Sequence, residues 1–138
     1  MSLTYNQVQI GDKLPPLEID VSTRLIVATA MASRDYQNVH HDRDAAQSLG
    51  SEDIFMNILT TNGLVGRFVT DWTGPTGLLN TVNIKLGVPN YAGDRMKLMG
   101  KVSAKHANNQ IEIDVVGKNS MGNHVNGTVL VTLPEGDA

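Results

Sequence analysis

The sequence predicts an α+β fold in which an antiparallel sheet wraps around one central helix. Three observations support this: a helical pattern of apolar residues over 57–72, four strand-like segments after it, and one strand-like segment before it. Short runs rich in Gly, Asn, Asp and Pro separate the later segments and favour turns between antiparallel strands. The chain has 138 residues. We therefore expect a single domain over residues 1–138, which is long enough for one hydrophobic core.

The first half of the chain is expected to begin with a strand and continue into helices. Residues 17–21 alternate apolar and acidic side chains, which is typical of a strand with one buried face. Ser22 or Thr23 can cap a helix that runs to about Ser33. Because this helix is apolar almost all round, we expect it to be largely buried. An irregular segment follows it, and then a short helix over residues 43–49.

The second half is expected to hold the central helix and the rest of the sheet. Gly63 and Gly66 lower the stability of a helix, so close packing is the expected reason for both. The segments expected to be strands are residues 79–88, 96–106, 111–118 and 124–133. His106 and His124 lie in these strands, and we expect them at the surface or facing a partner chain.

Charge and composition exclude several classes of protein. The chain has 11 basic and 14 acidic residues, a net charge of −3 and no basic tract, so nucleic acid is not an expected partner. The longest apolar run, about eight residues over 25–32, is too short to cross a bilayer. The N-terminus lacks the basic start and apolar stretch of a signal peptide. There is no cysteine, which excludes disulfides and Cys-based metal or nucleophile sites. We expect a cytoplasmic protein without a membrane partner.

The candidate catalytic residues are Asp35 and His40, five positions apart in the irregular segment. Such a pair can hold one water molecule between an acid and a base. Histidine is the side chain most easily tuned to move a proton near neutral pH, and a carboxylate can orient it or share the proton transfer. The alternative is a surface aspartate and a capping histidine in a loop. Spacing alone leaves both readings open.

This segment resembles the motif of the MaoC-like (R)-specific enoyl-CoA hydratases. That motif reads Asp-x-Asn-Pro-aliphatic-His, then x-Asp, with a small residue six positions after the His. Asp35 stands at the motif Asp, Val39 at the aliphatic position and His40 at the His. Asp42 fills the later acidic position and Ala46 the small one.

Two positions depart from the motif. Gln37 stands where the family has Asn, and Asn38 stands where it has Pro. Taking His41 as the motif His would restore Asn38 but would place Tyr36 at the Asp position. We therefore assign His40. The departures affect the shape of the loop and leave the pair of Asp35 and His40 intact.

Residues 34–42, 53–60 and 69–72 are more specifically similar to the small MaoC-like subunit of the actinobacterial steroid side-chain enoyl-CoA hydratase. The similarity extends over about 17–133. It implies a single hot-dog fold and hydration of a trans-2-enoyl-CoA, with a bulky steroid-derived acyl chain. It also implies a homodimer or a heteromer with a larger MaoC-like subunit, often fused to an OB-fold domain. No cofactor is implied, because hydration moves only water and protons.

The resemblance also assigns roles to residues. His40 is expected to remove a proton from water, and Asp35 to position the water and help return a proton to the α-carbon. The family stabilises the thioester oxygen with a backbone N–H at a His-Gly step that opens the central helix. This chain has Met56 and Asn57 at that step, and the N–H of Asn57 can still donate. A plain helix cap is the alternative role for Asn57.

Three other functions fit parts of the sequence less well. His40, His41 and Asp42 could be taken as metal ligands, but adjacent His side chains diverge and no helical His pair accompanies them. A hot-dog acyl-CoA thioesterase would use a carboxylate to direct water at the carbonyl carbon, and the Asp-x-x-x-x-His spacing argues against it. A non-catalytic subunit of a heteromeric hydratase is the remaining alternative, and the retained Asp35 and His40 argue against that.

Overall fold

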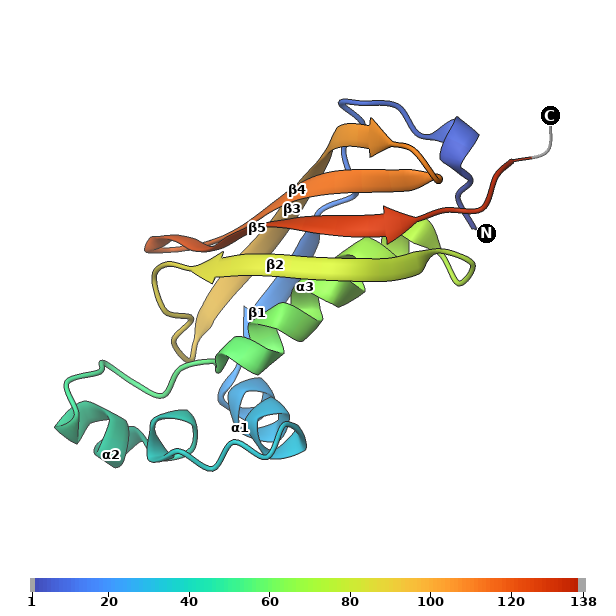
Figure 1. Cartoon of the computed structure of the whole chain (residues 1–138). Helices are drawn as coiled ribbons and strands as arrows, with labels where there is room; N and C mark the ends of the chain where they lie inside the picture. Colours follow the sequence, from blue (N-terminus) through green and yellow to red (C-terminus); the bar gives the residue numbers. More distant parts are fainter. Residues whose placement is uncertain (1, 137–138) are drawn as a thin grey trace.

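The computed structural model describes residues 2–136 and consists of one five-stranded sheet with helices on one side and at one end (Figure 1). The elements in chain order are the 3-10 turn η1 (Tyr5–Gln7), β1 (Leu17–Val21), α1 (Thr23–Ala32), the 3-10 turn η2 (Asn38–His40), α2 (Arg43–Ser48), α3 (Ile58–Thr73), β2 (Leu78–Leu86), β3 (Asp94–His106), β4 (Gln110–Asn119) and β5 (Gly122–Thr132). The elements predicted from sequence are all present, and their ends differ by no more than two residues.

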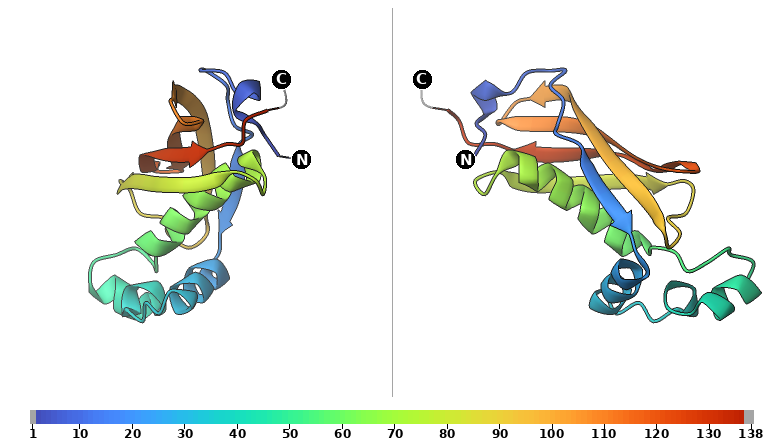
Figure 2. Two further views of the ribbon diagram at one scale, coloured as in Figure 1. Left: turned by 45° about the vertical axis from the view of Figure 1, so that its right-hand side comes forward. Right: turned by 180° about the vertical axis from the view of Figure 1, so that it is seen from behind.

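The sheet is antiparallel throughout, with strand order β1-β3-β4-β5-β2. It curls around α3, which lies along its inner side (Figure 2). The predicted α+β fold, an antiparallel sheet wrapped around a central helix, is therefore confirmed. The edge strands are β1 and β2, and they come from opposite sides of α3 in the sequence.

Helix α3 is buried along one face, where Val65, Phe68 and Val69 are at most 3% exposed. Gly100 of β3 lies directly against this face. A Cβ atom at Gly100 would stand 2.9 Å from Cε1 of Phe68, closer than real Cβ contacts allow. The absence of a side chain at Gly100 thus lets the sheet approach the helix and close around it.

Three expectations about packing were wrong. Helix α1 buries only Ile26 and Ala30, and Met31 is 51% exposed. It lies beyond the end of the sheet, so only one of its faces reaches the core (Figure 1). A Cβ at Gly63 would meet nothing within 4 Å, and one at Gly66 would make an ordinary contact with Leu79 at 3.5 Å. Close packing within the described chain therefore explains neither glycine.

The third error concerns His124, which is 1% exposed and not at the surface. In the β4–β5 ladder, Lys118 pairs with Asn123 and Gly117 pairs with Val125, so His124 is the extra residue of a β-bulge. A bulge breaks the alternation of a strand and redirects a side chain. His124 and Val125 are consequently both buried. His106 is exposed, as expected, with its Nε2 atom 3.7 Å from Glu112.

Strand β2 differs from the other strands because none of its residues is fully buried. It pairs with β5 on one side only, and within residues 2–136 no strand pairs with its other side. Its exposed apolar side chains include Leu78 at 61% and Leu86 at 40%. Within the same residues, no helix is both long and apolar enough to cross a membrane.

Candidate active site

The candidate site lies where the segment between α1 and α2 passes the N-terminus of α3, beyond one end of the sheet (Figure 1). Helix α1 ends with the Oγ of Ser33 donating to the carbonyl of Thr29, at 2.8 Å. Arg34 then adopts a left-handed conformation with φ 56°, and the N–H of Asp35 returns to the carbonyl of Ala30. This reversal directs the Asp35 side chain back toward α3.

Asp35 and His40 meet, as their spacing predicted. The Oδ2 atom of Asp35 lies 3.3 Å from Nε2 of His40. The His40 side chain is only 6% exposed and that of Asp35 is 24% exposed. The two groups therefore form a pair that is mostly shielded from solvent and accessible from the carboxylate side.

The tautomer of His40 follows from its second contact. Its Nδ1 lies 2.6 Å from the carbonyl oxygen of Phe55, and a carbonyl can only accept, so Nδ1 carries the hydrogen. The neutral ring then has a lone pair on Nε2, the atom that faces Asp35. With a neutral ring, Nε2 and the carboxylate are both acceptors and can share one proton donor such as water. With a protonated ring, Nε2 donates to the carboxylate directly. The rings of His40 and Phe55 are nearly perpendicular, with their centroids 5.0 Å apart, and this contact fixes the orientation of the imidazole.

Asp35 is held in its ionised form by neighbouring donors. The pKa of Asp35 is lowered, mainly because Nδ2 of Asn57 donates to its Oδ2 at 3.0 Å. Desolvation by burial opposes this, while the N–H of Gln37 and the two histidines His40 and His41 favour the charged form. The group facing Nε2 of His40 is thus a carboxylate at neutral pH.

Asn57 connects this carboxylate to α3. Its Oδ1 accepts from the N–H of Thr60 at 3.0 Å, which confirms it as the helix cap. Its Nδ2 also donates to Oγ of Ser33, at 3.0 Å. The backbone N–H groups of Asn57 and Ile58 find no acceptor within residues 2–136, as expected at the start of a helix. The site therefore has unpaired donors and a positive helix end beside the carboxylate.

The sequence did not reveal the role of His41. Its Nε2 lies 2.7 Å from the carbonyl oxygen of Asp35, so Nε2 is the donor in this contact. His41 thus holds the backbone of Asp35, while His40 faces the carboxylate. Tyr36, the residue that the alternative register would pair with His41, is 63% exposed. No three His, Asp or Glu side chains in the described part of the chain form a metal-binding group.

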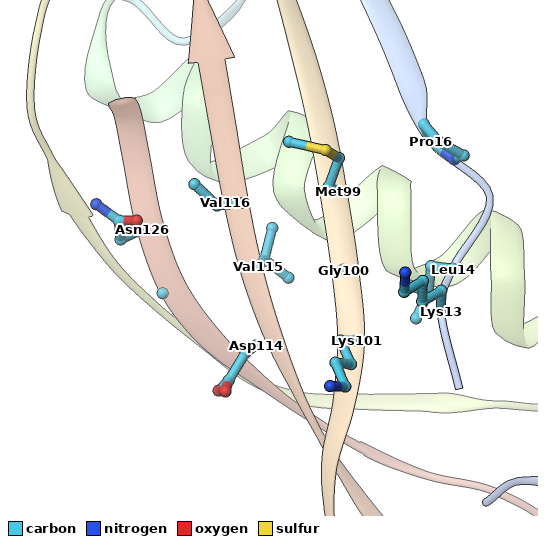
Figure 3. A pocket seen from close by; sticks show the side chains of 11 residues that line it. Lys13, Leu14, Pro16, Met99, Gly100, Lys101, Asp114, Val115, Val116 and Asn126 are labelled. Carbon is cyan, nitrogen blue, oxygen red and sulfur yellow. The ribbon is translucent and has the colours of Figure 1, made fainter. Parts of the chain in front are cut away.

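The described chain has several surface hollows, and two of them differ in their distance from the site. An open groove of about 300 Å³ between α1 and α3 is lined by Thr29, Ala32, Ser33, Leu59, Thr60, Gly63 and Leu64. A hollow of about 550 Å³ lies away from the site, over β3, β4 and β5, with Met99, Lys101 and Asp114 in its lining (Figure 3). The smaller groove is the relevant one, because Ser33 and Thr60 also bond to Asn57.

Comparison with known proteins identifies relatives over nearly the whole chain. The chain is 48% identical over 124 residues to the 3-oxo-4,17-pregnadiene-20-carboxyl-CoA hydratase beta subunit of Mycobacterium tuberculosis, covering 90% of this chain and 95% of that protein. It superimposes with a TM-score of 0.88 and 47% identity on a chain of the ChsH1-ChsH2 complex from Mycobacterium tuberculosis, covering 91% and 98% of the two chains.

The R-hydratase PhaJ1 from Pseudomonas aeruginosa shares the fold, with a TM-score of 0.90, 20% identity and coverage of 98% of this chain and 88% of that one. No family model matches the chain. Identity of 48% over nearly the full length of both proteins shows common family membership. With its hot-dog sheet curled around α3, the chain belongs to the MaoC-like enoyl-CoA hydratase family.

Proposed function

We propose that this chain is the catalytic subunit of an enoyl-CoA hydratase and adds water across a trans-2-enoyl-CoA at Asp35 and His40. One observation carries the proposal: Nε2 of His40 and the ionised carboxylate of Asp35 are 3.3 Å apart, and both accept when the ring is neutral. A single water can donate one hydrogen to each. The water oxygen is then free to attack an electrophilic carbon.

In the proposed reaction His40 is the base. Nε2 removes a proton from the water as its oxygen bonds to the β-carbon, and the electron pair of the double bond moves toward the thioester oxygen. The carboxylate of Asp35 stabilises the imidazolium that forms. The imidazolium then returns the proton to the α-carbon. One water has then been added as hydroxyl and hydrogen, and His40 is neutral again.

The charge that develops on the thioester oxygen needs donors that are already in place. The unpaired N–H groups of Asn57 and Ile58 at the positive end of α3 are suited to this task. The Nδ2 group of Asn57 is occupied by Asp35 and Ser33, so the backbone of Asn57, and not its side chain, would bind the oxygen.

The name of the Mycobacterium tuberculosis relative indicates the acyl group. That protein is called a hydratase of 3-oxo-4,17-pregnadiene-20-carboxyl-CoA, a thioester with a steroid acyl group. We assign the same class of bulky substrate to this chain. The groove between α1 and α3 adjoins Asn57 through Ser33 and Thr60 and can hold part of the acyl chain.

A partner chain is expected to complete the site. The related structure is titled a ChsH1-ChsH2 complex, and apolar side chains near this site are exposed. They include Met31 at 51%, Ile58 at 54% and Leu59 at 54%. Together with the unpaired edge of β2, they form a surface that a second hot-dog chain would cover. We propose a homodimer in isolation and a more active complex with a larger MaoC-like subunit.

The reaction is tested by following loss of the enoyl double bond and release of free CoA thiol in the same sample. A hydratase consumes the double bond without releasing thiol. His40→Ala is expected to lower turnover by at least about a hundredfold, the scale of lost acid–base catalysis. His106→Ala, at an exposed histidine on β3, is the matched control and should retain activity. Thiol release would instead support a thioesterase.

The alternative of a non-catalytic subunit is tested in the complex. Asp35→Asn or His40→Ala is introduced in this chain while the larger partner stays wild type. Full activity of the assembled complex would place the chemistry in the partner.

Light scattering tests whether the isolated chain associates, and it compares the wild type with variants that carry an added charge on β2. Leu78→Glu and Leu86→Glu should weaken association, because both side chains are exposed on the unpaired edge strand. Ile10→Glu is the control, since Ile10 is 65% exposed and lies near β3, away from β2. A fully active wild-type monomer at micromolar concentration would contradict the interface model.

A further inference from the structure

His124 lies directly beneath the first turn of α3, although it belongs to β5. The β-bulge at this position turns its side chain into the interior, where it is 1% exposed. Two neutral hydrogen bonds hold the ring. Its Nδ1 lies 2.7 Å from the carbonyl oxygen of Val88, and its Nε2 lies 2.8 Å from Oγ1 of Thr61.

The tautomer follows from these partners. The carbonyl of Val88 can only accept, so Nδ1 carries the hydrogen and Nε2 accepts from the hydroxyl of Thr61. Burial lowers the pKa of His124, while the bond to Val88 opposes this. The ring is therefore neutral, and both of its nitrogen atoms are occupied. It cannot accept a proton from water as His40 can.

A second set of bonds holds the chain just before α3. The N–H of Met56 donates to the carbonyl of Asn90, at 3.0 Å. The side chain of Asn90 is in turn held by Nδ2 of Asn119, at 2.9 Å. Met56 and Thr61 thus lie on either side of Asn57. Met56 bonds directly to the segment between β2 and β3, and Thr61 is linked to that segment through His124 and Val88. The Nδ2 of Asn90 also contacts the sulfur atoms of Met56 and Met96.

We propose that His124 is a positioning residue for the hydration reaction, which rests on the function proposed above. Through Thr61 and Val88 it fixes the first turn of α3, and with it the N–H groups of Asn57 and Ile58 that receive the thioester oxygen. A donor must lie where the charge develops, so a small displacement of this turn lowers the rate of the chemical step more than substrate binding.

The bond can be removed with little change in shape. Thr61→Val deletes the hydroxyl but keeps the branched side chain, and Thr61→Ser keeps the hydroxyl. We expect kcat to fall about tenfold in Thr61→Val, less than the hundredfold or more that follows complete loss of such a donor, with KM nearly unchanged. Thr61→Ser should restore most of kcat. Thr61→Val combined with His124→Asn should be no slower than the slower single variant, because both remove the same bond.

A fall in kcat that comes from a general loss of stability must be distinguished from one that comes from a displaced first turn of α3. Val131→Ala is the control, since Val131 is 1% exposed in β5 and lies away from the bulge. It should lower the melting temperature without lowering kcat at a temperature well below melting. Nitrogen NMR of the imidazoles should show hydrogen on Nδ1 of His124. An equal fall of kcat in Val131→Ala, or hydrogen on Nε2, would overturn the inference.

Failure of the proposed function and failure of this inference give different experimental results. If hydration survives His40→Ala at the wild-type rate, the proposed assignment of the chemistry to His40 is wrong, and the inference, which rests on that site, falls with it. If His40→Ala is inactive while Thr61→Val keeps the wild-type kcat, only the inference about His124 is overturned.

Discussion

His40 and His124 both lie near the start of α3, His40 through Asp35 and His124 through Thr61, and both are buried histidines whose Nδ1 donates to a backbone carbonyl. They differ at Nε2. In His40 this atom faces the carboxylate of Asp35, a second acceptor, at 3.3 Å. In His124 it accepts from the hydroxyl of Thr61, at 2.8 Å. The same residue in the same tautomer is thus available as a base in one place and fully bonded in the other. The partner of Nε2 therefore determines whether the histidine is available as a base.

Substituting each histidine should separate these roles most clearly. His40→Ala should lower turnover at least about a hundredfold. It should lower the free energy of unfolding by only about 1–3 kcal/mol, from the unpaired carbonyl of Phe55. His124→Ala should be more destabilising, roughly 3 kcal/mol or more, because two partners lose a bond and a cavity opens. Denaturant unfolding and turnover measured on both variants check this. A larger stability loss in His40→Ala would reverse the comparison.

The pH dependence of stability should identify His124. Its pKa is lowered from 6.5 in the folded state by burial. The unfolded chain therefore binds the proton more readily than the folded chain. The contribution of neutral His124 to the free energy of unfolding is fully present above about pH 6.5 and declines as the pH falls toward the lower folded pKa. His124→Gln should flatten this decline below about pH 6.5. Val131→Ala, which removes no titratable group, is the control and should leave the slope unchanged.

Removing the contact between Asn57 and Asp35 should have a smaller effect, on the ionisation of Asp35. Asn57→Ser keeps a hydroxyl for the helix cap but removes the Nδ2 donor, the main cause of the low pKa of Asp35. The pKa of Asp35 should therefore rise toward its ordinary value of 3.8. Carboxyl-carbon NMR titration of Asp35 in the two proteins measures this. An unchanged titration of Asp35 in Asn57→Ser would show that the Nδ2 contact does not hold the carboxylate ionised.

A change on α3 that touches neither histidine should have the smallest effect. A Cβ at Gly63 meets nothing within 4 Å. Gly63→Ala should therefore raise the free energy of unfolding by about 0.4–1 kcal/mol. Thermal and denaturant unfolding measure it. Gly66→Ala is the paired comparison, since a Cβ there would touch Leu79 at 3.5 Å. A destabilised Gly63→Ala would mean that this face of α3 is already covered by another chain.

The sequence predicts much of the fold because periodicity and turn residues are local signals. It also predicts that Asp35 and His40 meet, because both belong to one short segment that cannot separate them widely. The roles of His41 and His124 are not local in this way. Which of two adjacent histidines faces a carboxylate depends on the backbone turn at Arg34. The burial of His124 depends on a bulge that shifts strand register, and alternation in the sequence gives no sign of it.

The error over α1 has a different physical origin. Its apolar composition predicted burial, and within one chain the helix buries only Ile26 and Ala30. Hydrophobic pattern reports how much apolar surface must be covered, but not which molecule covers it. The exposed Met31 and the exposed Leu59 of α3 are therefore consistent with the partner surface proposed above.

Strand β2 determines what happens to the chain when it is made alone. Its nine residues contain a single charge, Lys85, and no proline. Natural edge strands usually carry charged residues or a proline, which prevent pairing with foreign strands. A single folded copy would therefore present an open template for intermolecular β-pairing until another chain covers the edge. The rate at which β2 is covered would therefore limit how much of the folded chain stays free of aggregation.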